Sequence, residues 1–412
     1  MNANKLIRFL VFSFFVESVG MPLFASDVPC GFDKGDCTLA GIIKHAKENT
    51  VASVIPASAR VPDIRLLEFS EVITDAYQYP IKPGTKEWKL IVGHDERVKA
   101  CQIPESVLKT MSTAGLVETV LTYPHYGDMR AYDTLQKGFG YMSSRFNGFQ
   151  ELFTRKDSGT VLLERYKAMD PAVFRKGFAS AERGRSIWDF ENVEILLVQN
   201  AIIAGLTEVQ HQDLRREALL KYQEKKQYTE SYGKNSLMLT ASLAGEVSQH
   251  DPLRYYQTSV NTPRGSSVSA FQMVPMDELT PQEEQNIYAW LSYNYPNPSQ
   301  LTRATRMYNC HSYAWYSQSE SNAIRINGPY QSTYWTDGSY VLWPSGTAYQ
   351  GMKLSYYNDD HSAIFYSGQN PSYSPGSSYC LSKWGSMPLM YHVCSDCPYN
   401  SMGIAIYTST RI

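Results

Sequence analysis

The sequence lacks an excess of charge of either sign. Of its 412 residues, 38 are Lys or Arg and 40 are Asp or Glu, so the formal net charge is −2. A protein that binds nucleic acid or an anionic membrane surface through its charge needs clustered Lys and Arg residues. We therefore expect neither nucleic acid nor an anionic membrane among its partners.

The sequence also lacks an apolar run that could cross a bilayer, which takes about 20 consecutive apolar residues. The strongest run, residues 9–16, is short and is followed by Glu17. A basic start, this short apolar run and the small residues before Ser26 are instead typical of a secretory signal. We expect cleavage near Ala25, which removes residues 1–25 and leaves a secreted, periplasmic or cell-surface protein without a transmembrane segment.

Internal repeats and long low-complexity tracts are absent too, so changes in residue pattern divide the rest of the chain. Residues 26–245 have a mostly helical pattern. Thr207 and Gln210, for example, form a capping box after which apolar residues recur at helical spacing. Residues 246–279 lose this periodicity and are rich in Ser, Thr, Gly and Pro. The sequence thus predicts a mainly helical N-terminal domain and a connector that could hold one hairpin.

A second domain is predicted over residues 280–412. Thr280 and Glu283 form a capping box around a proline in the first turn, which marks the start of a helix. Beyond this helix Tyr and Trp become dense, and alternating runs at 339–343 and 362–366 predict strands. A helix followed by a small antiparallel sheet places the chain in the α+β class.

The chain has seven cysteines, and their number bears on both redox state and chemistry. In an oxidising compartment most cysteines pair, and an odd number leaves at least one thiol free. We take Cys310 as that thiol, because a cysteine nucleophile must be able to form a thiolate. Cys394 or Cys397 should be disulfide-bonded, to each other or to Cys380. An alternative, which export argues against, is a zinc site made by Cys380, His392, Cys394 and Cys397.

Cys310 and His361 have the properties of a nucleophile and its general base. Attack of cysteine on an amide needs a thiolate, a nearby imidazole and donors for the developing oxyanion. Asn309 and Cys310 stand where a turn passes into a segment that can form a helix, and a helix start lowers a cysteine pKa. His361 opens a predicted strand, which we expect at a sheet edge. His311 adjoins the nucleophile, but its helical direction should aim it elsewhere.

The order of these residues resembles the NlpC-type and CHAP-type branch of papain-like cysteine peptidases. Cys310 at a helix start is followed by a Gly-rich hairpin within residues 337–354 and then by His361 in the run His-Ser-Ala-Ile. The resemblance covers roughly residues 283–412. It implies a papain-like domain in which a helix packs on a small antiparallel sheet.

The same resemblance bears on the third catalytic residue. The stretch from Ser382 to Gly385, Ser-Lys-Trp-Gly, is similar to Asn-Ser-Trp-Gly in papain, where the Asn orients the catalytic His. By this match Ser382 takes the place of the Asn, which departs from the papain pattern. Lys383 or His392 could serve instead.

The resemblance implies an exported cysteine peptidase or amidase that cleaves amide bonds in cell-wall peptide through an acyl-enzyme, without a metal or other cofactor. The expected partner is a peptide or peptidoglycan-type substrate. Two alternatives remain open: a non-catalytic surface interaction module, which Ser382 in place of Asn favours, and an acyltransferase or deamidase that uses the same dyad. The candidates for substrate contact are Tyr308, Asn309, Trp335 and Asp337. The scattered histidines taken as surface or capped residues are His45, His94, His125, His211 and His250.

Overall fold

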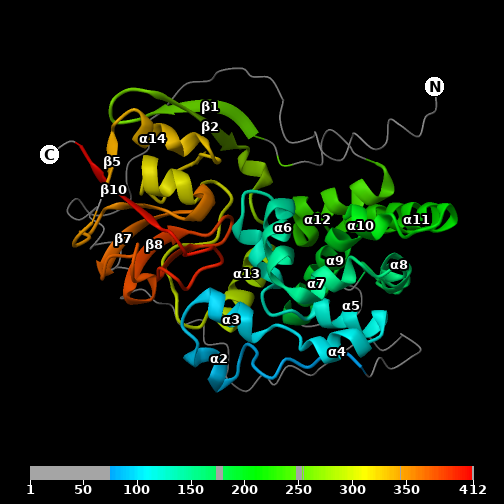
Figure 1. The fold of residues 1–412 in the computed structure, drawn as a ribbon. Helices are drawn as coiled ribbons and strands as arrows, with labels where there is room; N and C mark the ends of the chain where they lie inside the picture. The colour runs from blue at the N-terminus through cyan, green and yellow to red at the C-terminus, as the bar shows by residue number, and fades with distance from the viewer. Residues whose placement is uncertain (1–74, 173–179, 247–252, 254, 344, 411–412) are drawn as a thin grey trace, which may run out of the picture.

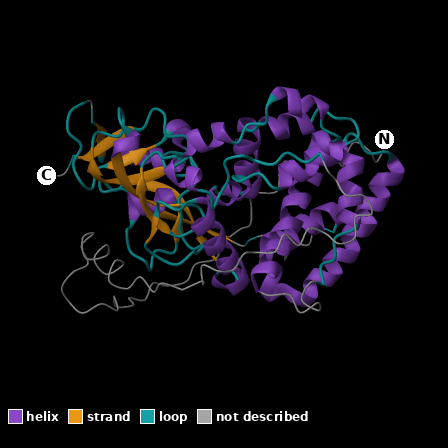
Figure 2. Cartoon of the chain, turned by 90° about the horizontal axis from the view of Figure 1, so that it is seen from below, coloured by secondary structure: helices purple, strands orange, loops and turns teal. Residues whose placement is uncertain are grey.

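The computed structural model describes residues 75–172, 180–246, 253, 255–343 and 345–410. The predicted signal segment and its cleavage site lie outside these residues. In the described part, helices occupy one side of the molecule and antiparallel strands the other (Figures 1 and 2). This arrangement is the mixture that the α+β class predicts. Within the same residues, no helix is both long and apolar enough to cross a membrane.

The N-terminal part is helical, as predicted. Its helices are α2 (Lys86–Leu90), α3 (His94–Ala100), α4 (Glu105–Thr110), α5 (Thr113–Leu121), η2 (Tyr126–Ala131), α6 (Leu135–Arg145), α7 (Asn147–Leu152), α8 (Ser158–Lys167), α9 (Ser180–Leu197), α10 (Asn200–Ile203), α11 (Glu208–Lys225), η4 (Lys226–Tyr228) and α12 (Thr229–Ala244). The core of this part gathers fully buried side chains such as Leu116 of α5, Leu163 of α8 and Leu196 of α9. The capping box of Thr207 and Gln210 forms at the start of α11, which confirms that prediction.

The C-terminal part contains one large antiparallel sheet. Its strands are β3 (Ser299–Gln300), β5 (Tyr340–Leu342), β6 (Lys353–Ser355), β7 (Ser362–Gly368), β8 (Ser378–Lys383), β9 (Leu389–Val393) and β10 (Ala405–Ser409). Their order is β3-β9-β8-β7-β6-β10-β5. The predictions of strands at β5 and β7 are confirmed, but β7 is the central strand and not an edge.

The Gly-rich hairpin predicted within residues 337–354 does not form. β10 lies between β5 and β6 and pairs with both, with Ile406 opposite Leu354. Ile406 and Leu354 are buried in the core below the sheet. The prediction was wrong because β10, from the end of the chain, is buried between β5 and β6. These two strands are close in sequence but do not pair with each other.

The connector predicted over residues 246–279 belongs to the C-terminal part. β1 (Tyr255–Asn261) and β2 (Ser267–Met273) form the expected antiparallel hairpin, and β4 (Ile324–Arg325) pairs with β2. Val268 of β2 is buried in one apolar cluster with residues of the Cys310 helix. The hairpin is therefore part of a folded unit, since the inward side chains of β2 complete its core.

Helix α13 (Pro281–Asn294) joins the two parts. It begins with the predicted capping box, in which Thr280 accepts from the Glu283 N–H and the Glu283 carboxylate accepts from the Thr280 N–H. Leu291 of α13 lies in one core cluster with Tyr132 of the helical part and with residues of the sheet. The two predicted domains therefore share a buried interface.

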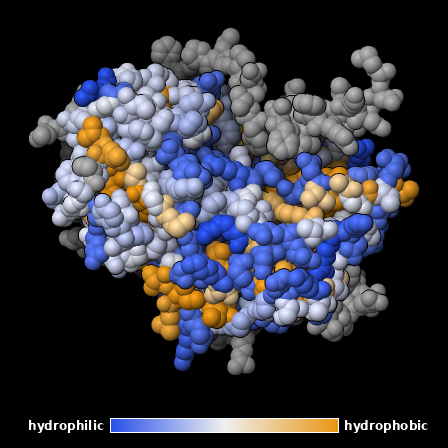
Figure 3. Space-filling view, viewed as in Figure 1, coloured by the Kyte–Doolittle hydropathy of each residue, from blue (hydrophilic) through white to orange (hydrophobic). Residues whose placement is uncertain are grey.

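On the face shown in Figure 3, hydrophobic side chains gather in a few patches among hydrophilic ones. Two of them, Leu90 at the end of α2 and Val92 just beyond it, are exposed by 80% and 51%. Small exposed apolar areas are ordinary on a folded protein.

A disulfide between Cys380 of β8 and Cys394, directly after β9, links two neighbouring strands, with Cα atoms 5.2 Å apart. This pair is one of the options predicted from the sequence, and Cys397 is a free buried thiol. Replacing both Cys380 and Cys394 by alanine should lower the free energy of unfolding by about 3 kcal/mol, because the bond closes a loop in the unfolded chain.

Urea unfolding without reductant would measure that loss. The control is Cys397→Ala, which removes a buried thiol near the same turn but no cross-link and should cost about 1 kcal/mol. Equal losses in the double variant and the control would show that the cross-link adds no stability.

Candidate active site

Cys310 begins a short helical segment that continues through η6 (Ser312–Tyr316). Asn309 caps this segment, because its side-chain oxygen accepts a hydrogen bond from the Ser312 N–H at 3.2 Å. The segment packs against β7, and the backbone N–H of Ser362 is close enough to the Cys310 sulfur to favour the thiolate. The predicted nucleophile therefore lies beside the first residue of the central strand.

His361 directly precedes β7 and is fully buried. Its ring stacks on Tyr399, with 3.7 Å between the ring centroids, and meets the ring of Tyr356 nearly at right angles at 4.8 Å. Neither ring nitrogen has a hydrogen-bond partner among the described residues. The structure thus brings Cys310 to the backbone next to His361, but the predicted hydrogen bond between thiol and imidazole does not form because the ring packs between tyrosines.

None of the three residues predicted to orient His361 bonds to its ring. The Ser382 hydroxyl is 2.7 Å from Nε2 of His392 and accepts from the Trp384 indole N–H at 3.0 Å. Lys383 is buried and donates to three backbone carbonyl oxygens. The pairing of β8 with β9 joins Ser382 to His392, so the assignment of Ser382 as the orienting residue does not hold in this conformation.

Burial keeps both members of the predicted dyad uncharged near neutral pH. It raises the pKa of Cys310 to about 12, assisted by the negative charge of Asp133 and opposed by the Ser362 N–H and by Lys137. Burial also lowers the pKa of His361 well below its usual value. The lowering of the Cys310 pKa that we expected from the helix start is therefore outweighed by desolvation. The described conformation holds a thiol and a neutral imidazole.

His311 lies in the same region and is also buried. Its Nδ1 is 2.8 Å from the Ser362 hydroxyl oxygen, which accepts from the Trp315 indole N–H at 2.9 Å. Burial lowers the pKa of His311 to about 4. Through Ser362 and Trp315, the ring of His311 helps to fix the helix of Cys310 on the start of β7.

The four residues predicted to contact the substrate fall into two groups. Tyr308 and Asn309 are buried, and the Asn309 amide group donates to Asp133 and to the Ile326 carbonyl, so they support the site from inside and offer no surface to a substrate. Trp335 and Asp337 are half-buried. Asp337 accepts from the Thr262 hydroxyl and from the Ser339 N–H, which attaches it to the β1–β2 hairpin.

A segment of the helical part covers the Cys310 region, and sequence reasoning missed it. Asp133 accepts from the Asn309 amide at 3.0 Å, and Lys137 of α6 pairs with Asp360 at 3.0 Å. Gly385 packs so closely below this segment that an added Cβ would lie 2.6 Å from the Ala131 backbone. Asp133 and Asn309 are 176 residues apart in the chain, so no local pattern links them. We name residues 130–137 the cover segment.

The zinc site considered at the C-terminus is not formed. Cys380 and Cys394 are bonded to each other, and both ring nitrogens of His392 are within hydrogen-bond distance of other groups, the Ser382 hydroxyl and the Val393 carbonyl. Three of the four expected ligands are therefore engaged elsewhere.

Comparison with known proteins found no matching family model, no matching curated protein and no matching solved structure. The assignment of a function therefore rests on the residues themselves.

Proposed function

We propose that the protein is an exported cysteine peptidase or amidase of papain-like type, with Cys310 as nucleophile and His361 as general base, that acts on cell-wall peptide. The observation that carries the proposal is the position of Cys310 at the start of a helical segment that packs against β7, where the nearby Ser362 N–H favours the charged form of the thiol. Cys310 thus lies beside Ser362, and His361 is the residue directly before Ser362 in the chain. A cysteine at a helix start and a histidine at the start of the central strand are the two elements that the resemblance to NlpC-type and CHAP-type peptidases pairs.

The proposed reaction is acyl transfer to the thiol followed by hydrolysis. His361 takes the proton of Cys310 as the sulfur attacks the amide carbonyl, and it then gives this proton to the leaving amine. Water next attacks the thioester with His361 as base, which releases the carboxylic acid and restores the thiol. The Cys310 N–H, at the start of the helical segment, is the candidate donor to the oxyanion.

Under this proposal the described conformation is a closed form. Cys310 is only 5% exposed, and the cover segment lies over its surroundings. Substrate access requires the Lys137–Asp360 pair to separate and the His361 ring to leave Tyr399 and approach the sulfur. An amine that attacks the thioester in place of water would make the same machinery an acyltransferase.

A second candidate function is a non-catalytic interaction module. The specific observation in its favour is that thiol and imidazole are both buried, uncharged and not hydrogen-bonded to each other. A protein that uses this domain only for contact would have no need to open it.

Replacing Cys310 by alanine should reduce hydrolysis of a peptidoglycan-type peptide to background, a loss on the order of 10⁶-fold if the chemistry depends on the nucleophile as in serine hydrolases. The matched control is Cys101→Ala, which removes another buried free thiol in the helical part and should leave the rate unchanged. Product release followed by mass spectrometry measures both. Full activity of the Cys310 variant would exclude the proposed mechanism.

Alkylation distinguishes the enzyme from the interaction module. Iodoacetamide at neutral pH, mapped by mass spectrometry, reports the reactivity of three free buried thiols in one sample, Cys101, Cys310 and Cys397. An opening site should give faster labelling of Cys310 than of the two internal references. Labelling of all three only after denaturation would favour the interaction module.

A further inference from the structure

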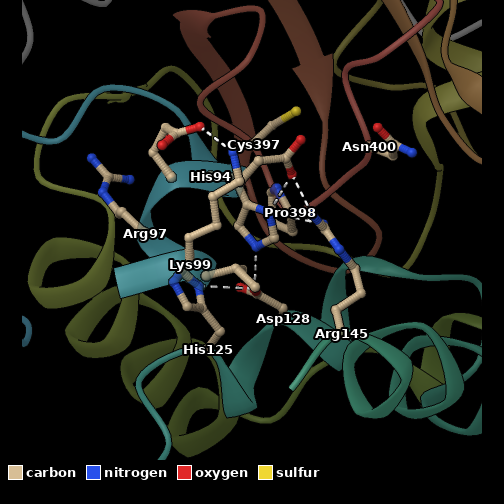
Figure 4. A network of polar contacts seen from close by, with 12 residues as sticks. His94, Arg97, Lys99, His125, Asp128, Arg145, Cys397, Pro398 and Asn400 are labelled. Carbon is tan, nitrogen blue, oxygen red and sulfur yellow. Dashed lines mark hydrogen bonds and ion pairs between the residues drawn. The ribbon is translucent and has the colours of Figure 1, made fainter. Parts of the chain in front are cut away.

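Two histidines and an aspartate converge inside the helical part, away from the thiol site. They are His94, His125 and Asp128, all at most 2% exposed (Figure 4). One potential metal-ligand atom from each lies within 4.8 Å of the others. Nε2 of His94 is 2.7 Å and Nδ1 of His125 is 3.1 Å from Oδ2 of Asp128.

Three short stretches of chain hold these side chains in place. His94 is the first residue of α3, His125 directly precedes η2, and Asp128 lies within η2. Tyr295, which follows α13, donates its hydroxyl hydrogen to the other oxygen of Asp128, Oδ1, at 2.7 Å. The carboxylate is thus oriented by a tyrosine from the C-terminal part, with Oδ2 left for the two imidazoles. Outer hydrogen bonds of this kind orient the ligands of metal ions.

The ring of His125 has no hydrogen bond at either nitrogen among the described residues. Its Nδ1 is close to Asp128 but is not aligned for a hydrogen bond to it. A buried imidazole without a partner is costly. The position of the His125 ring is explained if its Nδ1 and Oδ2 of Asp128 both bind an ion between them. A cavity of about 10 Å³ is lined by all three residues and has room for about one water molecule.

Among the described residues, Asp128 has no lysine or arginine as an ion-pair partner. Arg97 pairs with Asp396 at 2.5 Å, and Arg145 pairs with Asp95 at 2.6 Å. Within the described part, the only ion-pair partners of Asp128 are the two histidines. A divalent cation between the three side chains would balance the charge of the buried Asp128 carboxylate. It would leave the Arg97–Asp396 and Arg145–Asp95 ion pairs intact.

The far nitrogen of His94 also faces charged groups. Nδ1 is 3.6 Å from the Asp95 carboxylate and 3.5 Å from a guanidinium nitrogen of Arg145. A carboxylate behind the far nitrogen is common for metal-bound histidines, since it leaves the near nitrogen free to bind.

We propose that His94, His125 and Asp128 bind one divalent transition-metal ion, best suited to Zn²⁺, through two imidazole nitrogens and one carboxylate oxygen, with a water molecule as the fourth ligand. Tetrahedral zinc with bonds of about 2.0 Å separates its ligand atoms by about 3.3 Å. The separations of 2.7 Å and 3.1 Å measured to Asp128 need to widen by about 0.6 Å and about 0.2 Å to reach this value. Imidazole and carboxylate together suit zinc among the common divalent ions. This site is independent of the function proposed for Cys310.

The test uses the full mature chain without an affinity tag, produced in zinc-supplemented medium, with metal content measured by mass spectrometry. We expect one zinc per chain. Co²⁺ added after chelation should give the visible absorption of a tetrahedral site. Removal of the metal by a chelator should lower the temperature of thermal unfolding, and addition of Zn²⁺ alone should restore it. The reason is that a metal that binds only the folded state stabilises that state.

His125→Ala should lower the affinity for zinc more than about 100-fold. Loss of a residue that only hydrogen-bonds to a metal ligand costs about 10- to 100-fold, and loss of a ligand itself should cost more. His211→Ala, the same change on α11, is the matched control and should bind like the wild type. If His125→Ala fails to fold, the zinc content and the Co²⁺ spectrum of the wild type still test whether the metal site exists. Absence of both signals, or zinc retained equally by His125→Ala, would overturn the site.

Discussion

Lowering the pH from about 6.5 to about 4 should destabilise the folded protein steeply, because three buried histidines of the C-terminal part resist protonation. Burial lowers the pKa of His311 and of His392 to about 4, and that of His361 well below its usual value. In the unfolded chain each takes up a proton near pH 6.5. The unfolded state therefore binds more protons across this range, and each histidine removes about 1.4 kcal/mol of stability per pH unit.

Other groups work in the opposite direction but do not cancel the effect. Burial raises the pKa of Asp189 to about 6, so its protonation favours the folded state in part of the same range. His94, whose pKa is raised despite burial by the charge of Asp128, acts only above its unfolded value of about 6.5. Burial also raises the pKa of Glu191 and of Asp396, which act in the same direction as Asp189. Burial lowers the pKa of His125 to about 4, which adds a fourth histidine to the loss. Because the histidines act over the whole range from about pH 6.5 to about pH 4, a net loss remains as the pH falls.

Urea unfolding at a series of pH values measures this slope. His392→Gln removes one of the three titrating rings and should reduce the slope by about 1.4 kcal/mol per pH unit. It should also lower stability at neutral pH, since the ring has partners at both nitrogens. A free energy of unfolding that stays constant down to about pH 4 would mean that these rings gain access to solvent in the folded protein.

Replacing Lys225 by methionine should lower the free energy of unfolding by about 3–5 kcal/mol. Lys225 of α11 and Glu194 of α9 are both fully buried, and the ammonium nitrogen lies 2.9 Å from each carboxylate oxygen. The same nitrogen donates to the hydroxyl groups of Ser236 and Thr240 on α12. The substitution leaves a buried carboxylate without its cation, which is the costly half of breaking such a pair.

Thermal and urea unfolding of three variants would isolate this ion pair. Lys226→Met makes the same change at the next residue, which is exposed, and should cost no more than about 0.5 kcal/mol. Adding Glu194→Gln to Lys225→Met should recover part of the loss, because the unpaired charge is then gone. A double variant less stable than Lys225→Met alone would contradict this account.

The sequence by itself determined the local features. The starts of α11 and α13 were predicted because a capping box satisfies backbone donors within a few residues. The strands β5 and β7 were predicted from alternation, and the pairing of Cys394 with Cys380 was among the expected options. Each depends on interactions between residues close together in the chain.

Tertiary structure decided what depends on distant contacts. The insertion of β10 between β5 and β6, the bond of Ser382 to His392 and the cover segment over Cys310 all follow from packing that no local pattern encodes. Burial also reversed the expected lowering of the thiol pKa, because desolvation depends on everything that surrounds the sulfur.

The cluster of His94, His125 and Asp128 combines both kinds of information. The spacing of His125 and Asp128 is visible in the sequence, but His94 is 31 residues before His125 and reaches it only through the placing of α3. Tyr295, which orients Asp128, is 167 residues away from it in the chain. The prediction that His94 and His125 are surface or capped residues was wrong, because both are buried. Their convergence with Asp128 depends on the packing of the helical part against the end of α13, which no local pattern shows.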